Sequence, residues 1–210
     1  MKLIIFGATG MIGKELVKQA LFNQHQVVAF GRNVFTANFP ETPDLTLFHG
    51  ALFDSGEVGK AMQGCDAVLS ALGGHIDGDD KTRSLGIKII LEQMKKKKLN
   101  RIVAVGGLGV LNTLEDKLIL EQEDYPAEYE AVGREHLKAL RYLEASELNW
   151  TMICPPQILP HEATGNFITE ANYPPTPNNM HINAGDVALF MLKAIATNQY
   201  IQQKVGISNL

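Results

Sequence analysis

Short apolar runs alternate along the chain with longer segments in which apolar residues recur at helical spacing. The first run, Leu3 to Phe6, is followed by helical periodicity over residues 11–22 and by a second apolar run at 27–30. Uninterrupted apolar runs of this length are typical of strands buried on both faces. A strand, helix, strand unit of this length predicts a right-handed parallel crossover.

The same alternation continues through the rest of the chain. Further strands are expected at residues 45–48, 67–70, 102–105 and 151–153, and further helices near 56–63, 80–98, 127–146 and 184–197. This order predicts an α/β protein with a three-layer, doubly wound parallel sheet, the architecture to which Rossmann folds belong. The length of 210 residues suits one compact domain over 1–210.

Residues 155–180 interrupt the alternation of predicted strands and helices and are rich in proline. The prolines are Pro155, Pro156, Pro160, Pro174, Pro175 and Pro177. Long irregular connections in compact domains are usually functional, and this one follows the sixth strand, where ligands bind in open α/β sheets. We therefore expect 155–180 to be a substrate-side loop, with a passive crossover as the alternative.

A glycine-rich motif joins the first strand to the first helix. Residues 7–13 read GATGMIG, a GxxGxxG variant of the dinucleotide fingerprint. Gly7 allows the tight turn, Gly10 lets the backbone approach a pyrophosphate, and Gly13 allows close packing of helix on strand. The helix amides would then face the phosphates. The predicted contacts in this motif are Gly7, Thr9, Gly10, Met11 and Ile12.

The residues after the second strand indicate which dinucleotide is bound. An NAD-binding protein usually has an acidic residue here, whereas this chain has Arg32 and Asn33. A guanidinium can bind a 2′-phosphate through two parallel hydrogen bonds. The pattern predicts NADP(H) as cofactor, with an ordinary surface arginine as the alternative.

Small residues also follow the fourth and fifth strands. Leu72 and Gly73 follow the fourth strand, and Val105 runs into Gly106 after the fifth. Such residues would let a cofactor pass over the strand ends without steric conflict. Each cluster taken singly could instead be a turn.

Composition narrows the classes of function. The net charge of −4 disfavours nucleic acid as a partner, because phosphate backbones require a clustered cationic face. The six histidines lack metal-site spacing, so no metal is expected. Two separated cysteines, no signal-peptide pattern and no long apolar run indicate a cytoplasmic protein that does not enter the membrane.

Several of these segments together resemble the atypical short-chain dehydrogenase/reductases, most closely the flavin reductase (NADPH) and biliverdin reductase B family. The resemblance spans nearly the whole chain and is carried by GATGMIG, Arg32, CDAVLSALGG, REHLKALRYLEASELNW with the following CPP, and DVALFML. NmrA-like proteins, which bind dinucleotides without necessarily turning them over, are similar in the same places.

This resemblance implies that NADPH lies along the strand ends and that a flat acceptor stacks on the nicotinamide. It adds Ala51, Leu52 and Pro155 to the expected cofactor contacts. His136 matches a histidine of the family motif, and His75 lies in the loop after the fourth strand, so both are candidate catalytic residues. Gln157 stands where the family has a second histidine, which leaves the acceptor open.

The Tyr-x-x-x-Lys pair of the alcohol dehydrogenases is missing, since Tyr129 follows Tyr125 by four residues and Gly133 follows Tyr129. A flavin or quinone accepts hydride without a strong protein acid. We therefore expect an NADPH-dependent reductase of a flat conjugated acceptor such as flavin, quinone or a biliverdin-like molecule. The main alternative is a non-catalytic NADP(H) sensor, and a nucleotide-sugar isomerase fits less well. The family likeness favours a monomer.

Overall fold

A mostly parallel sheet runs through the computed structural model, which describes residues 1–75, 77 and 79–210. Its strand order is β3-β2-β1-β4-β5-β6-β10-β8; β8 is antiparallel to β10 and the other neighbours are parallel. The strands are β1 Lys2–Phe6, β2 Gln26–Gly31, β3 Leu45–His49, β4 Ala67–Ser70, β5 Arg101–Val105, β6 Asn149–Cys154, β8 Phe167–Ala171 and β10 Gln203–Asn209.

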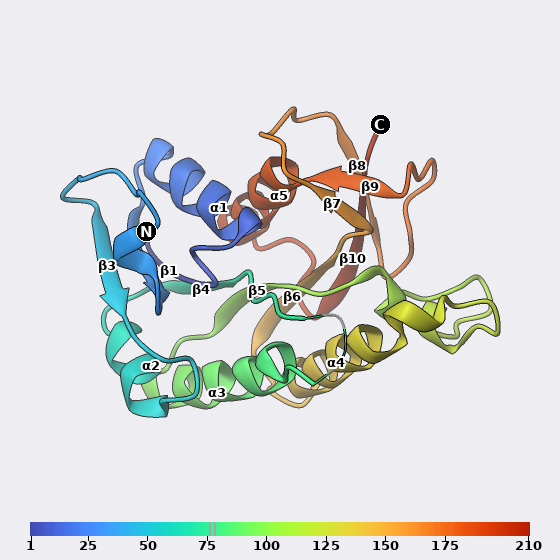
Figure 1. The fold of residues 1–210 in the computed structure, drawn as a ribbon, viewed down its shortest axis with the longest axis horizontal. Coiled ribbons are helices and arrows are strands. Elements are labelled where there is room, and N and C mark those ends of the chain that lie inside the picture. The colour runs from blue at the N-terminus through green and yellow to red at the C-terminus, as the bar shows by residue number, and fades with distance from the viewer. Residues whose placement is uncertain (76, 78) are drawn as a thin grey trace.

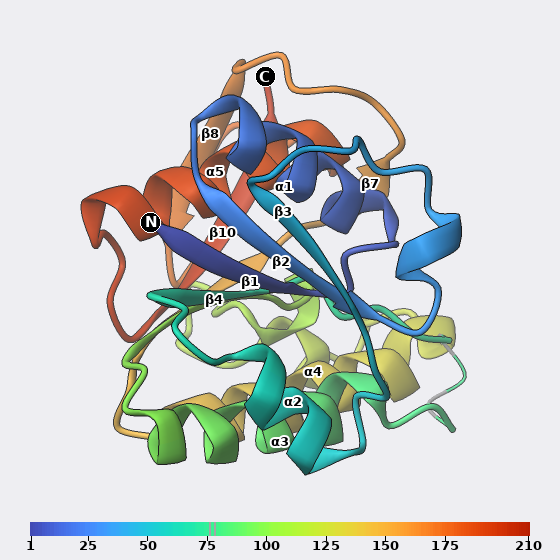
Figure 2. The ribbon, with the colours of Figure 1, turned by 90° about the vertical axis from the view of Figure 1, so that its left-hand side faces the viewer.

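Helices cover both faces of the sheet. In Figures 1 and 2, α1 (Met11–Phe22) and α5 (Ala184–Thr197) lie on one face, and α2 (Ser55–Ala61), α3 (Thr82–Lys97) and α4 (Ala127–Glu144) lie on the other. The three-layer, doubly wound α/β architecture expected from the sequence is thereby confirmed.

The core follows from the two-residue period of the strands. In β1, Leu3 and Ile5 pack with the α1 and α5 side, whereas Ile4 and Phe6 pack with the side of α2, α3 and α4. All four side chains are buried. Burial on both faces explains why the strand is apolar throughout rather than alternating.

The predicted elements are present, with shifts of one or two residues at most ends. The helices at 11–22 and 184–197 have the expected bounds, whereas the first and sixth strands extend beyond the predicted ranges. Helix and strand ends depend on capping and ladder bonds that periodicity does not reveal.

The expectation of an irregular loop over residues 155–180 is wrong. The segment contains β7 (Gln157–Leu159) and β8, and β7 pairs with β9 (His181–Asn183) in a separate two-stranded sheet. The prolines flank these strands and none lies within one, so each strand keeps its amide donors.

Asp186 fixes this segment to the start of α5. The buried carboxylate accepts hydrogen bonds from the Thr164 amide and hydroxyl, the Gly165 amide and the Asn209 side chain, at 2.7 to 2.9 Å. Burial alone would raise the pKa of Asp186, but these hydrogen bonds outweigh it and lower the pKa. The segment is therefore anchored at its midpoint.

Among the described helices, none is both long and apolar enough to cross a membrane. The expectation of one domain stays a prediction.

Candidate cofactor-binding site

The strand order reverses between β1 and β4, so the chain leaves the carboxyl ends of these two strands toward opposite faces of the sheet. The chain leaves β1 at Gly7 toward α1 on one face and leaves β4 at Ala71 toward α3 on the other. The Ala71 amide donates to the Phe6 carbonyl at 2.9 Å, so the two exits lie side by side. Open α/β sheets bind ligands at such a switch point.

Two glycines of the first loop are required by packing within the protein. Gly7 has φ +75°, and a Cβ there would lie 2.3 Å from the Ala71 carbonyl oxygen. A Cβ at Gly13 would lie 2.0 Å from the Gly7 carbonyl oxygen. Gly10 differs, because it is exposed and a Cβ there would meet only the Gly7 oxygen, at 3.3 Å. Its open side is where a pyrophosphate could approach the backbone.

The first turn of α1 provides anion donors. Gly10 caps the helix without a side-chain hydrogen bond, and no acidic residue lies in the first turn. The first hydrogen bond of the helix runs from the Lys14 amide to the Gly10 carbonyl, so the amides of Met11, Ile12 and Gly13 lie ahead of the ladder. These amides suit a diphosphate group.

Arg32 and Asn33 lie just after β2, on an exposed turn that leads into the 3-10 helix η1 (Val34–Thr36). The Asn33 carbonyl accepts from the Thr36 amide and hydroxyl, which fixes the turn. The Arg32 guanidinium has no hydrogen bond or ion pair to any described residue. It is therefore available to an anionic ligand.

The loops after β3 and β4 meet on one glycine of α3. A Cβ at Gly86 would lie 2.7 Å from both Leu52 Cδ2 and Leu72 Cδ1, which places the two predicted contacts together. The Ala51 amide, beside Leu52, donates to Glu57 Oε2 at 2.7 Å. Gly73 is exposed, and a Cβ there would have no neighbour within 4 Å. Packing therefore does not explain this glycine, whereas a cofactor lying over the strand end would.

Backbone hydrogen bonds join the carboxyl ends of β5 and β6. The Gly106 amide, next to the half-buried Val105, donates to the Ile153 carbonyl at 2.7 Å, and the Leu108 amide donates to the Pro155 carbonyl at 3.1 Å. These bonds place Val105, Gly106 and Pro155 at the same sheet edge as Gly7 and Gly73, and their role as cofactor contacts stays a prediction.

The ring of His136 lies against Gly107, the residue that follows Gly106 after β5. A Cβ at Gly107 would be 2.8 Å from His136 Cδ2, and His136 Nδ1 is buried with no partner among the described residues. Burial, with a further contribution from the Arg83 cation, lowers the pKa of His136 to about 3 although Glu135 opposes the shift. The imidazole is therefore neutral at physiological pH.

The backbone of His75 is held by Arg83 of α3. His75 is exposed, and Arg83 donates to the carbonyls of both His75 and Gly74 at 2.8 Å. The structure shows no direct contact between His75 and His136, and Arg83 is the residue that links their surroundings. The sequence analysis missed Arg83, because its spacing resembles that of any solvated helix position.

Tyr125 also lies near the end of β5, and its position was not predicted from the sequence. Its hydroxyl lies over two glycines, with a Cβ at Gly109 or Gly133 falling 2.7 or 2.9 Å from it. Burial raises the pKa of Tyr125, and neighbouring Tyr129 adds to this shift. The phenol keeps its proton and is not activated as an acid.

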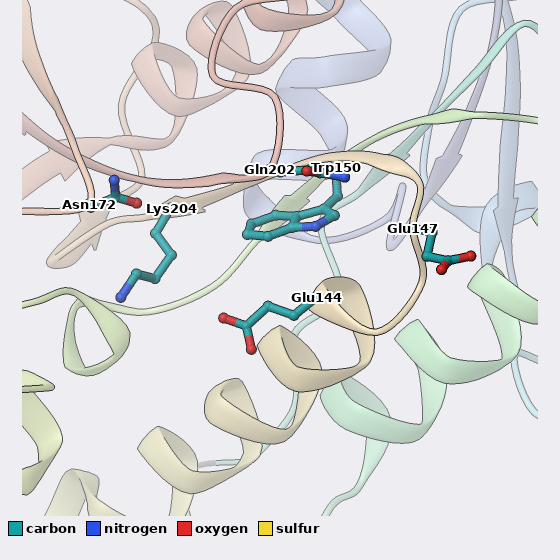
Figure 3. Close-up of a pocket in the computed structure, with 6 residues that line it drawn as sticks. All are labelled: Glu144, Glu147, Trp150, Asn172, Gln202 and Lys204. Atoms are coloured by element: carbon teal, nitrogen blue, oxygen red, sulfur yellow. The ribbon is translucent and has the colours of Figure 1, made fainter.

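A separate cavity lies away from this edge. Figure 3 shows its lining residues Glu144, Glu147, Trp150, Asn172, Gln202 and Lys204. Trp150 and Lys204 come from the beginnings of β6 and β10, so this cavity is at the opposite end of the parallel strands. Among residues 1–75, 77 and 79–210, no group of three His, Cys, Asp or Glu side chains is placed to hold a metal ion.

The fold, the uncapped helix end and the glycine-lined strand edge together define a dinucleotide-binding Rossmann protein, and the residues present fit such a cofactor. The chain matches the NAD(P)H-binding family over residues 7–198 and belongs to it. The protein therefore has an NAD(P)H-binding domain.

Three solved structures are similar to this chain in fold. A Burkholderia pseudomallei protein, named as a candidate exported protein, is 30% identical with a TM-score of 0.85 and 99% of each chain covered. A candidate NADH-flavin reductase from Streptococcus pneumoniae is 24% identical with a TM-score of 0.85 and all of both chains covered. A short-chain dehydrogenase/reductase from Veillonella parvula, in complex with NADP, is 17% identical with a TM-score of 0.75, covering 99% of this chain and 94% of the other.

Proposed function

We propose that this protein is an NADPH-dependent reductase that transfers hydride to a flat conjugated acceptor such as a flavin, a quinone or a biliverdin-like molecule. Membership of the NAD(P)H-binding family supports a reductase-like role. The similar Streptococcus pneumoniae protein, named as a candidate flavin reductase, supports the acceptor class.

The observation that carries this proposal is the packed setting of the two titratable side chains beside the end of β5, His136 against Gly107 and Tyr125 against Gly109. His136 is neutral because burial depresses its pKa, and the pKa of Tyr125 is raised by burial and by the neighbouring Tyr129. Neither group is tuned to protonate a carbonyl oxygen during hydride transfer. A conjugated ring accepts hydride with less assistance, and positioning then provides most of the catalysis.

NADPH is proposed rather than NADH because Arg32 is exposed, cationic and without a partner among the described residues. Bound dinucleotide would supply the hydride. Gly10 and the first amides of α1 would hold its diphosphate, and Gly73 and Gly106 would leave room along the strand ends.

The acceptor would lie between the glycine-rich strand ends and residues 155–166. Pro155 already borders the end of β5 through its bond to Leu108, and Asp186 fixes the chain at Thr164 and Gly165. A fixed wall of this kind suits a rigid planar molecule, because less side-chain entropy is lost on binding.

We also make proposals for the location of the protein in the cell, its oligomeric state and its partners. Cys65 and Cys154 are both buried and unpaired, as in proteins of a reducing compartment, and we propose the cytoplasm as the location. We further propose a monomer that has a small-molecule acceptor as its partner and that does not bind nucleic acid. The net charge of −4 supports the last point.

The test is NADPH consumption, with NADH as control, across a panel of flavins, quinones and biliverdin at matched protein concentration. Saturable turnover that prefers NADPH is the expected result and would name the acceptor class. Tight NADPH binding without turnover above background would overturn the reductase proposal in favour of a nucleotide-sensing role like that of NmrA-like proteins.

A further inference from the structure

His49 is the last residue of β3, and it lies next to the turn that carries Arg32. In the parallel pairing of β2 with β3, His49 is the register partner of Gly31, the residue before Arg32. Neighbouring strands are about 4.8 Å apart, so His49 and Arg32 occupy the same corner of the sheet edge.

Strand alternation and an aromatic contact determine the side to which His49 points. Leu45 and Leu47 pack with the cluster on the α1 side, and the two-residue period places His49 on that same face. There its ring stacks on Phe35 of η1, with centroids 6.2 Å apart and planes at 10°. Phe35 is 67% exposed, so a flat ring pair is exposed to solvent at the turn that follows Arg32.

The charges around this ring pair favour an anion. In the described part of the chain, no hydrogen bond or ion pair engages the side chain of either Arg32 or His49. Glu57, whose carboxylate accepts a hydrogen bond from the Ala51 amide at 2.7 Å, belongs to α2 on the opposite face. Two nitrogen-bearing side chains therefore face solvent at this corner with no carboxylate bound to them.

We infer that His49, oriented by its stacking on Phe35, is a second donor beside Arg32 to the 2′-phosphate of NADP(H). This inference rests on the cofactor part of the proposed function and specifies the residues that select the phosphate. An imidazole N–H donates well to a phosphate oxygen, and hydrogen bonds to charged groups are the stronger class. NADH has a hydroxyl at that position and would gain little from His49.

The experiment is calorimetric binding of NADPH and NADH to the whole protein and its His49→Leu and His49→Gln variants. Leucine keeps the apolar bulk of the ring and removes both ring nitrogens, whereas glutamine retains a side-chain N–H donor. His25→Leu is the matched control, since His25 precedes β2 at the opposite end of that strand. Thermal melting of each variant establishes that it is folded.

We expect His49→Leu to weaken NADPH binding about tenfold or more while NADH binding stays within twofold, with partial recovery in His49→Gln. Equal weakening of both cofactors, or no change in either, would overturn the inference. Because no acceptor is present, a failure of the reductase proposal appears only in the turnover assay. Loss of NADPH preference in Arg32→Ala but not in His49→Leu would overturn this inference alone.

A second measurement avoids substitution. Titration of labelled protein with 2′,5′-ADP should shift the His49 ring signals in NMR spectra, whereas ADP without the 2′-phosphate should shift them much less. Equal shifts with the two nucleotides would contradict a role in phosphate recognition.

Discussion

The ring of His136 packs against Gly107, so this glycine, two residues after the end of β5, and the histidine of α4 constrain each other. Gly107 has φ −148°, an extended conformation that any residue adopts. The absence of a side chain is therefore required by His136 rather than by the backbone, because a Cβ would lie 2.8 Å from its ring.

Gly107→Ala is expected to lower the free energy of unfolding by about 1–3 kcal/mol, because the His136 ring must move. The effect should shrink markedly when His136→Ala is already present, since the obstacle is then gone. Chemical denaturation of the two single variants and the double variant measures this coupling. Additive effects would show that the two residues do not constrain each other.

Gly73→Ala is expected to leave stability near that of the parent protein while weakening NADPH binding about tenfold. A Cβ there has no protein neighbour within 4 Å, so it would fill only space available to the cofactor. Thermal melting and calorimetric binding separate the two effects. A variant that binds NADPH normally would show that the cofactor does not pass over Gly73.

Arg32→Ala is expected to weaken NADPH binding at least tenfold (about 1.4 kcal/mol or more) and NADH binding little. Only NADPH carries the 2′-phosphate to which the guanidinium would bind. Arg134→Ala is the control, because Arg134 is exposed and pairs with Glu130 on α4. Calorimetry with both cofactors provides the comparison. Equal losses for NADPH and NADH would contradict a 2′-phosphate role.

His136 should make stability depend on pH. Its folded pKa of about 3 lies below the ordinary histidine value of 6.5, so below pH 6.5 the unfolded chain binds a proton that the folded protein does not. Stability should therefore fall as pH is lowered from 6.5 to 4.5, by up to about 2 kcal/mol from this residue. Urea denaturation at several pH values should show a smaller fall in His136→Gln than in the exposed control His161→Gln. An identical fall in both variants would exclude a buried neutral His136.

Asp186→Asn is expected to cost about 2–4 kcal/mol of stability, because the amide nitrogen of asparagine would face donors that now bond to the carboxylate. The lowered pKa means that this contribution is present above the ordinary value of 3.8 and is lost as pH falls through the lower, folded pKa. The exposed Asp44→Asn is the control. Equal urea midpoints for the two variants would contradict the anchoring role of Asp186.

The apolar periodicity and the glycine motif were sufficient to predict most of the helices and strands, and the loop at the carboxyl end of β1. The GATGMIG segment specifies a turn and a helix start through backbone constraints at Gly7 and Gly13, and these are readable from spacing. The position of Arg32 directly after β2 was predictable in the same way, because the strand is recognisable from its apolar run, whereas the role of Arg32 stays a prediction.

Features that depend on distant segments were not predictable. Strand β10 alternates Val205 and Ile207 with smaller or polar residues, a signal that could have been recognised, but its pairing with β8 depends on a chain reversal within a proline-rich segment. Arg83 acquires its position from its hydrogen bonds to the carbonyls of Gly74 and His75, and the burial of His136 Nδ1 depends on the packing of α4 on the end of β5. No sequence spacing encodes these contacts.

The measurement that tests the central claim most directly is the rate of acceptor reduction with NADPH carrying deuterium at one or the other face of nicotinamide C4. Transfer within a site that fixes the nicotinamide predicts a slower rate for one of the two labelled cofactors and an unchanged rate for the other. Equal rates for both, together with a rate no greater than that without protein, would contradict hydride transfer at this site.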